Sequence, residues 1–311
     1  MSFSDLKPML RQQLREVIYT IRDMDVVWRS LLNRRAGKLY RAHRPTFSLT
    51  QQRVLRELQA VGISEVPFAE LFGNDPLLRD IQTVFDERLA SASRNPRKDF
   101  LLDPRNAEHF ALDGHDPFFR FATDPRVLNI VNGYMEMWSQ LHDIVINQTQ
   151  PLEPGESKGR SQLWHRDSHD VRVCKVFVYL NDVDETGGPF CYVRKSQKGA
   201  RWWSLYPQHR PSGNYPALEG VEERLPAADT RTYVGKAGTI LFCDTIGIHK
   251  GGYATTGTRK MLTCSFFSSA HTSSRRHYTL PKNVDGFRDA LAPEAQFAIT
   301  VPVGTKPRFA F

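Results

Sequence analysis

Along the first part of the chain, apolar residues recur at intervals of three and four, which places them on one face of a helix. The first such run occupies residues 4–33 and contains Leu6, Leu10, Leu14, Val17, Ile18 and Ile21. A second run occupies residues 50–62, where Thr50 is the expected N-cap and Gly62 stands just past the expected end. Residues 1–140 are therefore predicted to be mainly helical.

Two further helices are expected within that part of the chain. Asp75 and Asp124 each precede a proline, a combination that starts helices, and these should run toward Leu89 and Trp138. Residues 95–121 lie between them and are rich in Pro, Asp, Asn and aromatic residues. They are expected to form a loop, either at the surface or as part of a substrate wall.

From about His142 the pattern changes to short runs of β-branched and aromatic residues, separated by turns that contain Gly, Pro or Asp. The runs are HDIVINQTQ, SQLWH, RVCKVFVYL, PFCYVRKS, TRTYV, TILFCD and RKMLTCSFFSS. Many short strands of this kind predict a sandwich or barrel. The expected fold is mainly β with helices (α+β), a double-stranded β-helix, or jelly roll, supported by N-terminal helices.

The whole chain, residues 1–311, is expected to form a single domain. Its parts would be a helical buttress at about 1–140, a jelly-roll core at about 141–270 and a C-terminal extension at 271–311. A long irregular insertion, residues 198–230, separates two predicted strands and is a candidate lid over a site.

Composition narrows the class of protein. Of 311 residues, 40% are hydrophobic and 24% are charged, which is ordinary for a soluble globular protein. The formal net charge is +8, but the basic residues are dispersed, so we expect no nucleic-acid partner and favour a small, anionic substrate. No apolar run is long enough for a membrane span, and the N-terminus lacks the apolar stretch of a secretory signal; a cytoplasmic protein is expected.

The four cysteines add a further constraint. They are Cys174, Cys191, Cys243 and Cys264. None forms a CxxC pair, and each lies in an apolar run, which predicts buried reduced thiols rather than a zinc site.

The residues with the clearest chemistry lie in two separate segments. His165 and Asp167 are two positions apart beside a predicted strand, so their side chains share a face. His249 follows a second predicted strand, and Arg259 comes ten residues later. Two histidines and one carboxylate form the facial triad of non-heme Fe(II) oxygenases. A guanidinium stays charged and can bind both oxygens of a carboxylate, as a keto-acid partner of the metal would require.

The chain resembles the phytanoyl-CoA dioxygenase family of Fe(II)/2-oxoglutarate-dependent oxygenases, and more closely its bacterial members. The likeness lies in residues 164–167, 175–199 and 238–259. It implies that His165, Asp167 and His249 bind the metal and that Arg259 binds the distal carboxylate of 2-oxoglutarate. The turn at residues 194–197 departs from the family's small-residue pattern, which bears on the substrate rather than on the metal.

Other residues have two readings each. Gln148 and Gln162 could donate to the oxo acid or serve the fold, and Phe177 could line the oxoglutarate pocket or pack in the core. His169 and Asp170 are expected to support the site from outside the triad or to lie at the surface. The aromatic residues of the insertion could cover the substrate or pack outward; they are Trp202, Trp203 and Tyr206.

The resemblance predicts a dioxygenase that uses Fe(II), 2-oxoglutarate and O2 to hydroxylate an unactivated C–H bond of a small organic substrate, with release of succinate and CO2. The presence of Asp167 favours hydroxylation over halogenation. Desaturation, epoxidation and cyclisation use the same residues and stay open, as do substrate identity and oligomeric state. The alternatives are a non-catalytic cupin-like metal-binding or sensor protein and a metal-dependent hydrolase or isomerase.

Overall fold

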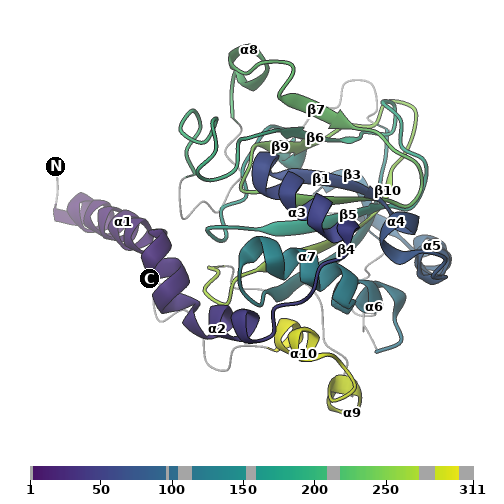
Figure 1. Cartoon of the computed structure of the whole chain (residues 1–311). Coiled ribbons are helices and arrows are strands. Elements are labelled where there is room, and N and C mark those ends of the chain that lie inside the picture. The colour runs from purple at the N-terminus through teal and green to yellow at the C-terminus, as the bar shows by residue number, and fades with distance from the viewer. Residues whose placement is uncertain are drawn as a thin grey trace.

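Two antiparallel β-sheets face each other, and helices cover the outer face of the larger one (Figure 1). The computed structural model describes residues 3–95, 98–103, 114–151, 159–208, 218–272 and 284–300. Its helical elements are α1 (Phe3–Arg22), the π-helix η1 (Val26–Leu32), α2 (Arg34–Ala42), α3 (Leu49–Val61), α4 (Phe68–Phe72), α5 (Leu77–Leu89), α6 (Pro117–Thr123), α7 (Pro125–Met135), the 3-10 helix η2 (Arg160–Gln162), α8 (Val221–Arg224), α9 (Val284–Arg288) and α10 (Pro293–Ile299).

The strands are β1 (Ile63–Pro67), β2 (Ser93–Asn95), β3 (Lys98–Asp103), β4 (Gln140–Thr149), β5 (Cys174–Tyr179), β6 (Phe190–Val193), β7 (Thr230–Tyr233), β8 (Thr239–Asp244), β9 (His249–Gly251) and β10 (Lys260–Phe267). The large sheet has the order β1-β8-β5-β10-β4-β3-β2, and the small sheet the order β7-β6-β9. Neighbouring strands far apart in sequence, such as β5 with β10, are what a double-stranded β-helix requires. The predicted fold class is confirmed.

Side chains that alternate along each strand give the large sheet two buried faces, one toward the helices and one toward the small sheet. Val176, Leu262 and Ile146 point to the helices and belong to the main core with residues of α5, α6 and α7. Phe177 and Tyr179 point to the small sheet and form a second core between the sheets. Because successive side chains of a strand alternate, each strand contributes to both cores. Residues of both sheets meet in the interior between them, so a site built from both sheets would lie there.

The mainly helical part before residue 140 also contributes strands, because β1 lies at the edge of the large sheet and pairs with β8. Strands β2 and β3 extend its other edge through β4. β1 has five residues, ends in Pro67 and directly follows a helix, so its pattern is too short to identify from sequence. That the chain forms one domain stays a prediction.

Several helix ends also differ from expectation. The N-cap of α3 is Ser48, which forms a capping box with Gln51, rather than the predicted Thr50. Gly62 ends this helix in the left-handed conformation, with φ 84°, as predicted. The predicted long first helix divides into α1 and η1.

The region 95–121, predicted to be a loop, contains β3 and α6; residues 96–97 and 104–113 lie outside the described part of the chain. All four cysteines are buried and free. Within the ranges that the structure describes, no helix has both the length and the apolar character needed to cross a membrane.

Candidate metal centre

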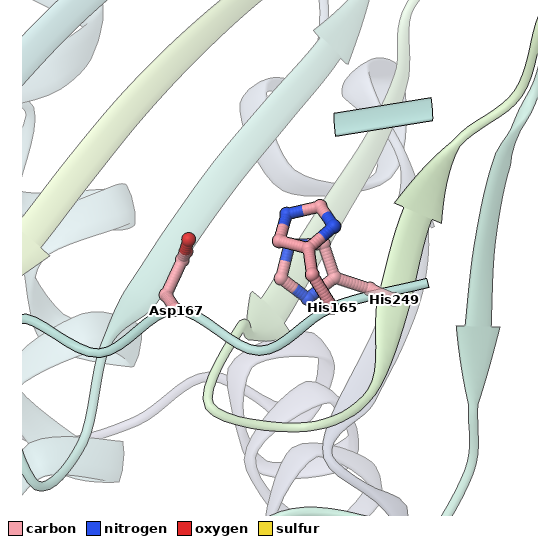
Figure 2. A group of neighbouring side chains, drawn as sticks. All are labelled: His165, Asp167 and His249. Carbon is pink, nitrogen blue, oxygen red and sulfur yellow. The ribbon is translucent and has the colours of Figure 1, made fainter. Parts of the chain in front are cut away.

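His165, Asp167 and His249 converge in the interior between the two sheets (Figure 2). One ligand atom from each residue lies within 4.8 Å of those of the other two, and all three residues are buried. The backbone brings the segments together: the N–H of His165 donates to the carbonyl of His249 at 2.9 Å, and the N–H of His249 donates back at 3.0 Å. His165 thus forms a single β-bridge beside β9 rather than part of the strand that the sequence suggested.

Both imidazoles are oriented by carbonyl groups. Nδ1 of His165 lies 2.8 Å from the carbonyl oxygen of Leu163, and Nδ1 of His249 lies 2.9 Å from that of Gly247. Since a carbonyl only accepts, each Nδ1 carries the proton and each Nε2 keeps its lone pair. Burial lowers the pKa of His249 well below its usual value, and the nearby His165 lowers it further. Neutral imidazoles of this tautomer are what a divalent metal requires.

The carboxylate of Asp167 forms an ion pair with Lys175, whose Nζ is 2.7 Å from Oδ2. Burial raises the pKa of Asp167, but the positive charge of Lys175 opposes burial most strongly, and the pKa of Asp167 lies below its ordinary value. The triad therefore supplies two neutral nitrogen donors and one anionic oxygen, a set that suits Fe(II).

Sequence reasoning placed Lys175 only on a strand face and missed this ion pair. The available signal was a charged residue within the apolar run of β5, two positions before Phe177 on the interior face. A lysine at such a position needs a buried anion nearby.

Arg259 is buried immediately before β10, with 4% of its surface exposed. One terminal nitrogen donates to the carbonyl of Gly188, while Nε has no hydrogen-bond partner. No ion pair among the described residues includes it, so a buried cation lacks an acidic partner there. Burial lowers the pKa of Arg259, and such an arrangement favours an anionic ligand.

Gly251 links Arg259 to the triad. It lies two positions after His249 in β9, so both residues point to the same side of the strand. A Cβ built on Gly251 would lie 3.7 Å from Nη2 of Arg259 and 3.5 Å from the carbonyl oxygen of Ser161. The guanidinium of Arg259 therefore lies on the same interior wall as His249, beside the position two residues further along β9.

Phe177 and Gln162 also lie in this region. The ring of Phe177 is 4.8 Å from that of Phe190, which is 5.7 Å from the ring of His249. Gln162 is buried in η2; its side-chain Oε1 accepts from the backbone N–H of Gly159, and its Nε2 has no partner among the described residues. An unsatisfied buried donor is costly unless a ligand accepts from it.

Gln148 lies elsewhere. It is in register with Lys260, on the face of β4 that carries Ile144 and Ile146 toward the helices. The sheet itself therefore separates Gln148 from the triad, and the predicted contact with the oxo acid does not fit this placement. Its neighbour Asn147 points inward instead, and its buried Oδ1 has no partner within the described chain.

Arg166, between the two ligands, fixes their segment to the rest of the fold. Its guanidinium donates to the carbonyls of Ser196 and Ile246, at 2.5 and 2.6 Å, and stacks over Trp203 at 4.7 Å. Burial lowers the pKa of Arg166 to about 10. The turn at residues 194–197, where the family pattern changes, is thus connected directly to the metal-binding segment.

The neighbouring residues take structural roles. Asp170 accepts from the indole of Trp28 at 2.8 Å and from the backbone of Ser268 at 2.6 Å. Within the predicted lid, Trp202 donates to Asp229, and Gln208 donates to the carbonyl of Asp167. Residues 209–217 of that insertion lie outside the described ranges.

Comparison with known proteins identifies relatives of this architecture. The family model described as Phytanoyl-CoA dioxygenase (PhyH) matches residues 76–261. Among solved structures, the non-heme alpha ketoglutarate dependent epimerase SnoN from nogalamycin biosynthesis is 17% identical, with a TM-score of 0.50 over 71% of this chain and 81% of that one. SnoN with Fe3+, alpha ketoglutarate and nogalamycin RO is 16% identical, with a TM-score of 0.51 over 73% and 87%.

EctD from S. alaskensis with 2-oxoglutarate and 5-hydroxyectoine is 15% identical, covers 76% of this chain and 82% of its own, and has a TM-score of 0.49. No curated protein sequence matches this chain. The structural likeness to SnoN supports the fold, and the family match confirms the resemblance drawn from the sequence.

Proposed function

Because this chain belongs to the phytanoyl-CoA dioxygenase family of Fe(II)/2-oxoglutarate-dependent oxygenases, we propose that it hydroxylates an unactivated C–H bond of a small organic substrate. The net reaction would convert substrate, 2-oxoglutarate and O2 into hydroxylated product, succinate and CO2. One observation carries the proposal: a buried His–Asp–His group lies along the same interior wall as a buried arginine that has no acidic partner among the described residues.

His165, Asp167 and His249 would hold the metal. In each histidine, the hydrogen bond from Nδ1 to a carbonyl leaves Nε2 with a lone pair for the metal. The carboxylate of Asp167 is already anionic. Three protein ligands on one side leave the other positions open to a chelating oxo acid and O2. When bound, the iron would supply the redox chemistry, with O2 as the oxidant and 2-oxoglutarate as the co-substrate that is oxidised to succinate and CO2, while the protein supplies orientation and excludes water.

Arg259 would bind the distal carboxylate of 2-oxoglutarate. Within the described ranges its buried charge has no acidic partner, and a fork of two parallel N–H bonds would orient the oxo acid toward the metal. Gln162 would donate its unsatisfied Nε2 to the same ligand, and Phe177 would form an apolar wall. Gly251 leaves the space beside the guanidinium free of a side chain.

The direct test is optical. Anaerobic addition of Fe(II) and 2-oxoglutarate should produce a weak visible charge-transfer band. His249→Ala should abolish the band. His43→Ala, which changes the exposed C-cap histidine of α2, should leave the band unchanged. Absence of the band with the intact protein, under conditions where it is folded, would exclude the proposed function.

The reaction outcome needs a separate test. Candidate substrates can be screened for stimulated succinate release, with mass spectrometry of the product. Gain of one oxygen supports hydroxylation; a product of unchanged mass would instead match the epimerase description of SnoN. Binding of metal and 2-oxoglutarate without succinate release for any substrate would favour the non-catalytic alternative.

A further inference from the structure

In the described part of the chain, helix α1 presents an apolar stripe that stays half exposed. Leu10, Leu14, Val17 and Ile21 of the helix, and Met24 two positions past its end at Arg22, follow one another at alternating intervals of four and three residues, and each is 50–56% exposed. In Figure 1 the helix extends away from the two sheets. A strict four-three repeat is the narrow seam of a coiled coil, whereas a helix that packs on a globular core carries a wider apolar face.

The base of this helix is attached to the body through polar contacts. Arg22 donates to the carbonyl of Ala270 at 2.6 Å, and Lys198 donates to the carbonyl of Asp23 at 2.6 Å and pairs with Asp25 at 3.3 Å. These bonds hold the end of α1 against the protein. The seam is thus left open while the attachment uses other side chains.

Three further apolar side chains are exposed in the neighbouring helix η1. Val26, Leu31 and Leu32 are 69, 67 and 41% exposed, in addition to the five seam residues. Each of these side chains offers at least two methylene-sized groups of about 30 Å² each, or roughly 60 Å² of apolar surface. Eight such side chains from each of two copies would together bury roughly 1,000 Å². That total reaches the area at which specific protein–protein interfaces begin.

We propose that the seam of α1 binds the same seam of a second copy of this chain, forming a helical dimer that is separate from the proposed active site. A heptad seam fits another helix of equal repeat, and a two-fold axis pairs identical surfaces so that the assembly closes. The seam residues are uncharged, so the net charge of +8 acts on the pair only at longer range, where salt screens it.

The test compares two lysine substitutions on the full chain. Leu14→Lys with Val17→Lys places charge in the seam, whereas Glu16→Lys places the same side chain at an exposed position beside it. Sedimentation equilibrium should give twice the chain mass of 35.6 kDa for wild type and Glu16→Lys. The seam variant should associate roughly a hundredfold more weakly and sediment as a monomer.

Circular dichroism and the thermal transition of the sheet core provide the folding control, because the seam residues belong to neither core cluster. Association that strengthens or persists at higher salt supports the proposal. A monomeric wild type at tens of micromolar, or a seam variant that dimerises as wild type does, would overturn it. Binding of a monomeric wild type to lipid vesicles through this helix would likewise overturn it in favour of a membrane surface.

Discussion

Replacing Arg259 tests the proposed co-substrate site most sharply. Arg259→Gln removes the positive charge but keeps a polar side chain in a pocket where the carbonyl of Gly188 still needs a donor. In the free protein no acid of the described residues offsets the desolvation of this buried guanidinium, so we expect the substitution to leave the free energy of unfolding unchanged or slightly raised. The loss should appear in ligand binding.

The magnitude follows from the burial of the site. Removing one partner of a buried, hydrogen-bonded charge pair costs about 2–5 kcal/mol, which corresponds to a dissociation constant for 2-oxoglutarate raised by roughly thirtyfold to a few thousandfold. Arg259→Lys keeps the positive charge without the planar fork, so its dissociation constant for 2-oxoglutarate should lie between those of Arg259→Gln and wild type. Metal affinity should be unchanged, because Arg259 belongs to a different part of the wall from the triad.

The assay is an anaerobic absorbance titration of the Fe(II)-loaded protein with 2-oxoglutarate and, in parallel, with 2-oxobutyrate, which lacks the distal carboxylate. Wild type should strongly prefer 2-oxoglutarate, and Arg259→Gln should bind the two acids with similar affinity. If the variant kept the wild-type preference, or lost affinity for both acids equally, Arg259 would not be the carboxylate-binding group.

Three further predictions concern the surroundings of the triad. Lys175→Met removes the ammonium that pairs with the carboxylate of Asp167, so the metal-free protein should lose about 2–4 kcal/mol of stability. The affinity for Mn(II), measured by calorimetry, should rise, because the lysine no longer competes with the metal for that carboxylate. An unchanged affinity would argue against this competition. Gly247→Ala would place a Cβ 1.9 Å from the hydroxyl of Tyr192, so urea unfolding should show a loss of about 1–3 kcal/mol, whereas Gly159→Ala, which faces open space, should change little; equal effects would refute the clash. Burial raises the pKa of Asp244, so wild type loses stability as pH rises through that pKa. Asp244→Asn should therefore be relatively more stable at about pH 7 than at about pH 4, and a pH-independent difference in unfolding midpoints would contradict this.

Part of the fold was readable because its determinants are local. The four-three spacing predicted α1 and α3, and Gly62 marked a helix end because only glycine adopts its left-handed backbone easily. The apolar runs of β5, β8 and β10 identified strands because a buried sheet requires such side chains on both faces. These signals lie within ten or twenty residues.

The chemistry of the site was also contained in residue types and order. His165, Asp167, His249 and Arg259 were singled out as metal ligands and a carboxylate partner, and the tertiary structure places these four residues along one interior wall. Their assignment as functional groups stays a proposal that the optical and binding experiments address.

What the tertiary structure alone decided depends on pairing between distant segments. β1 became a strand only by pairing with β8, and Gln148 faces the helices rather than the site because the register of β4 decides which of two adjacent side chains points inward. Lys175 meets Asp167 across the interior, and among the described elements no packed surface covers the seam of α1. Local patterns determine which element a segment forms, whereas the contacts between elements follow from how the whole chain closes around its two cores.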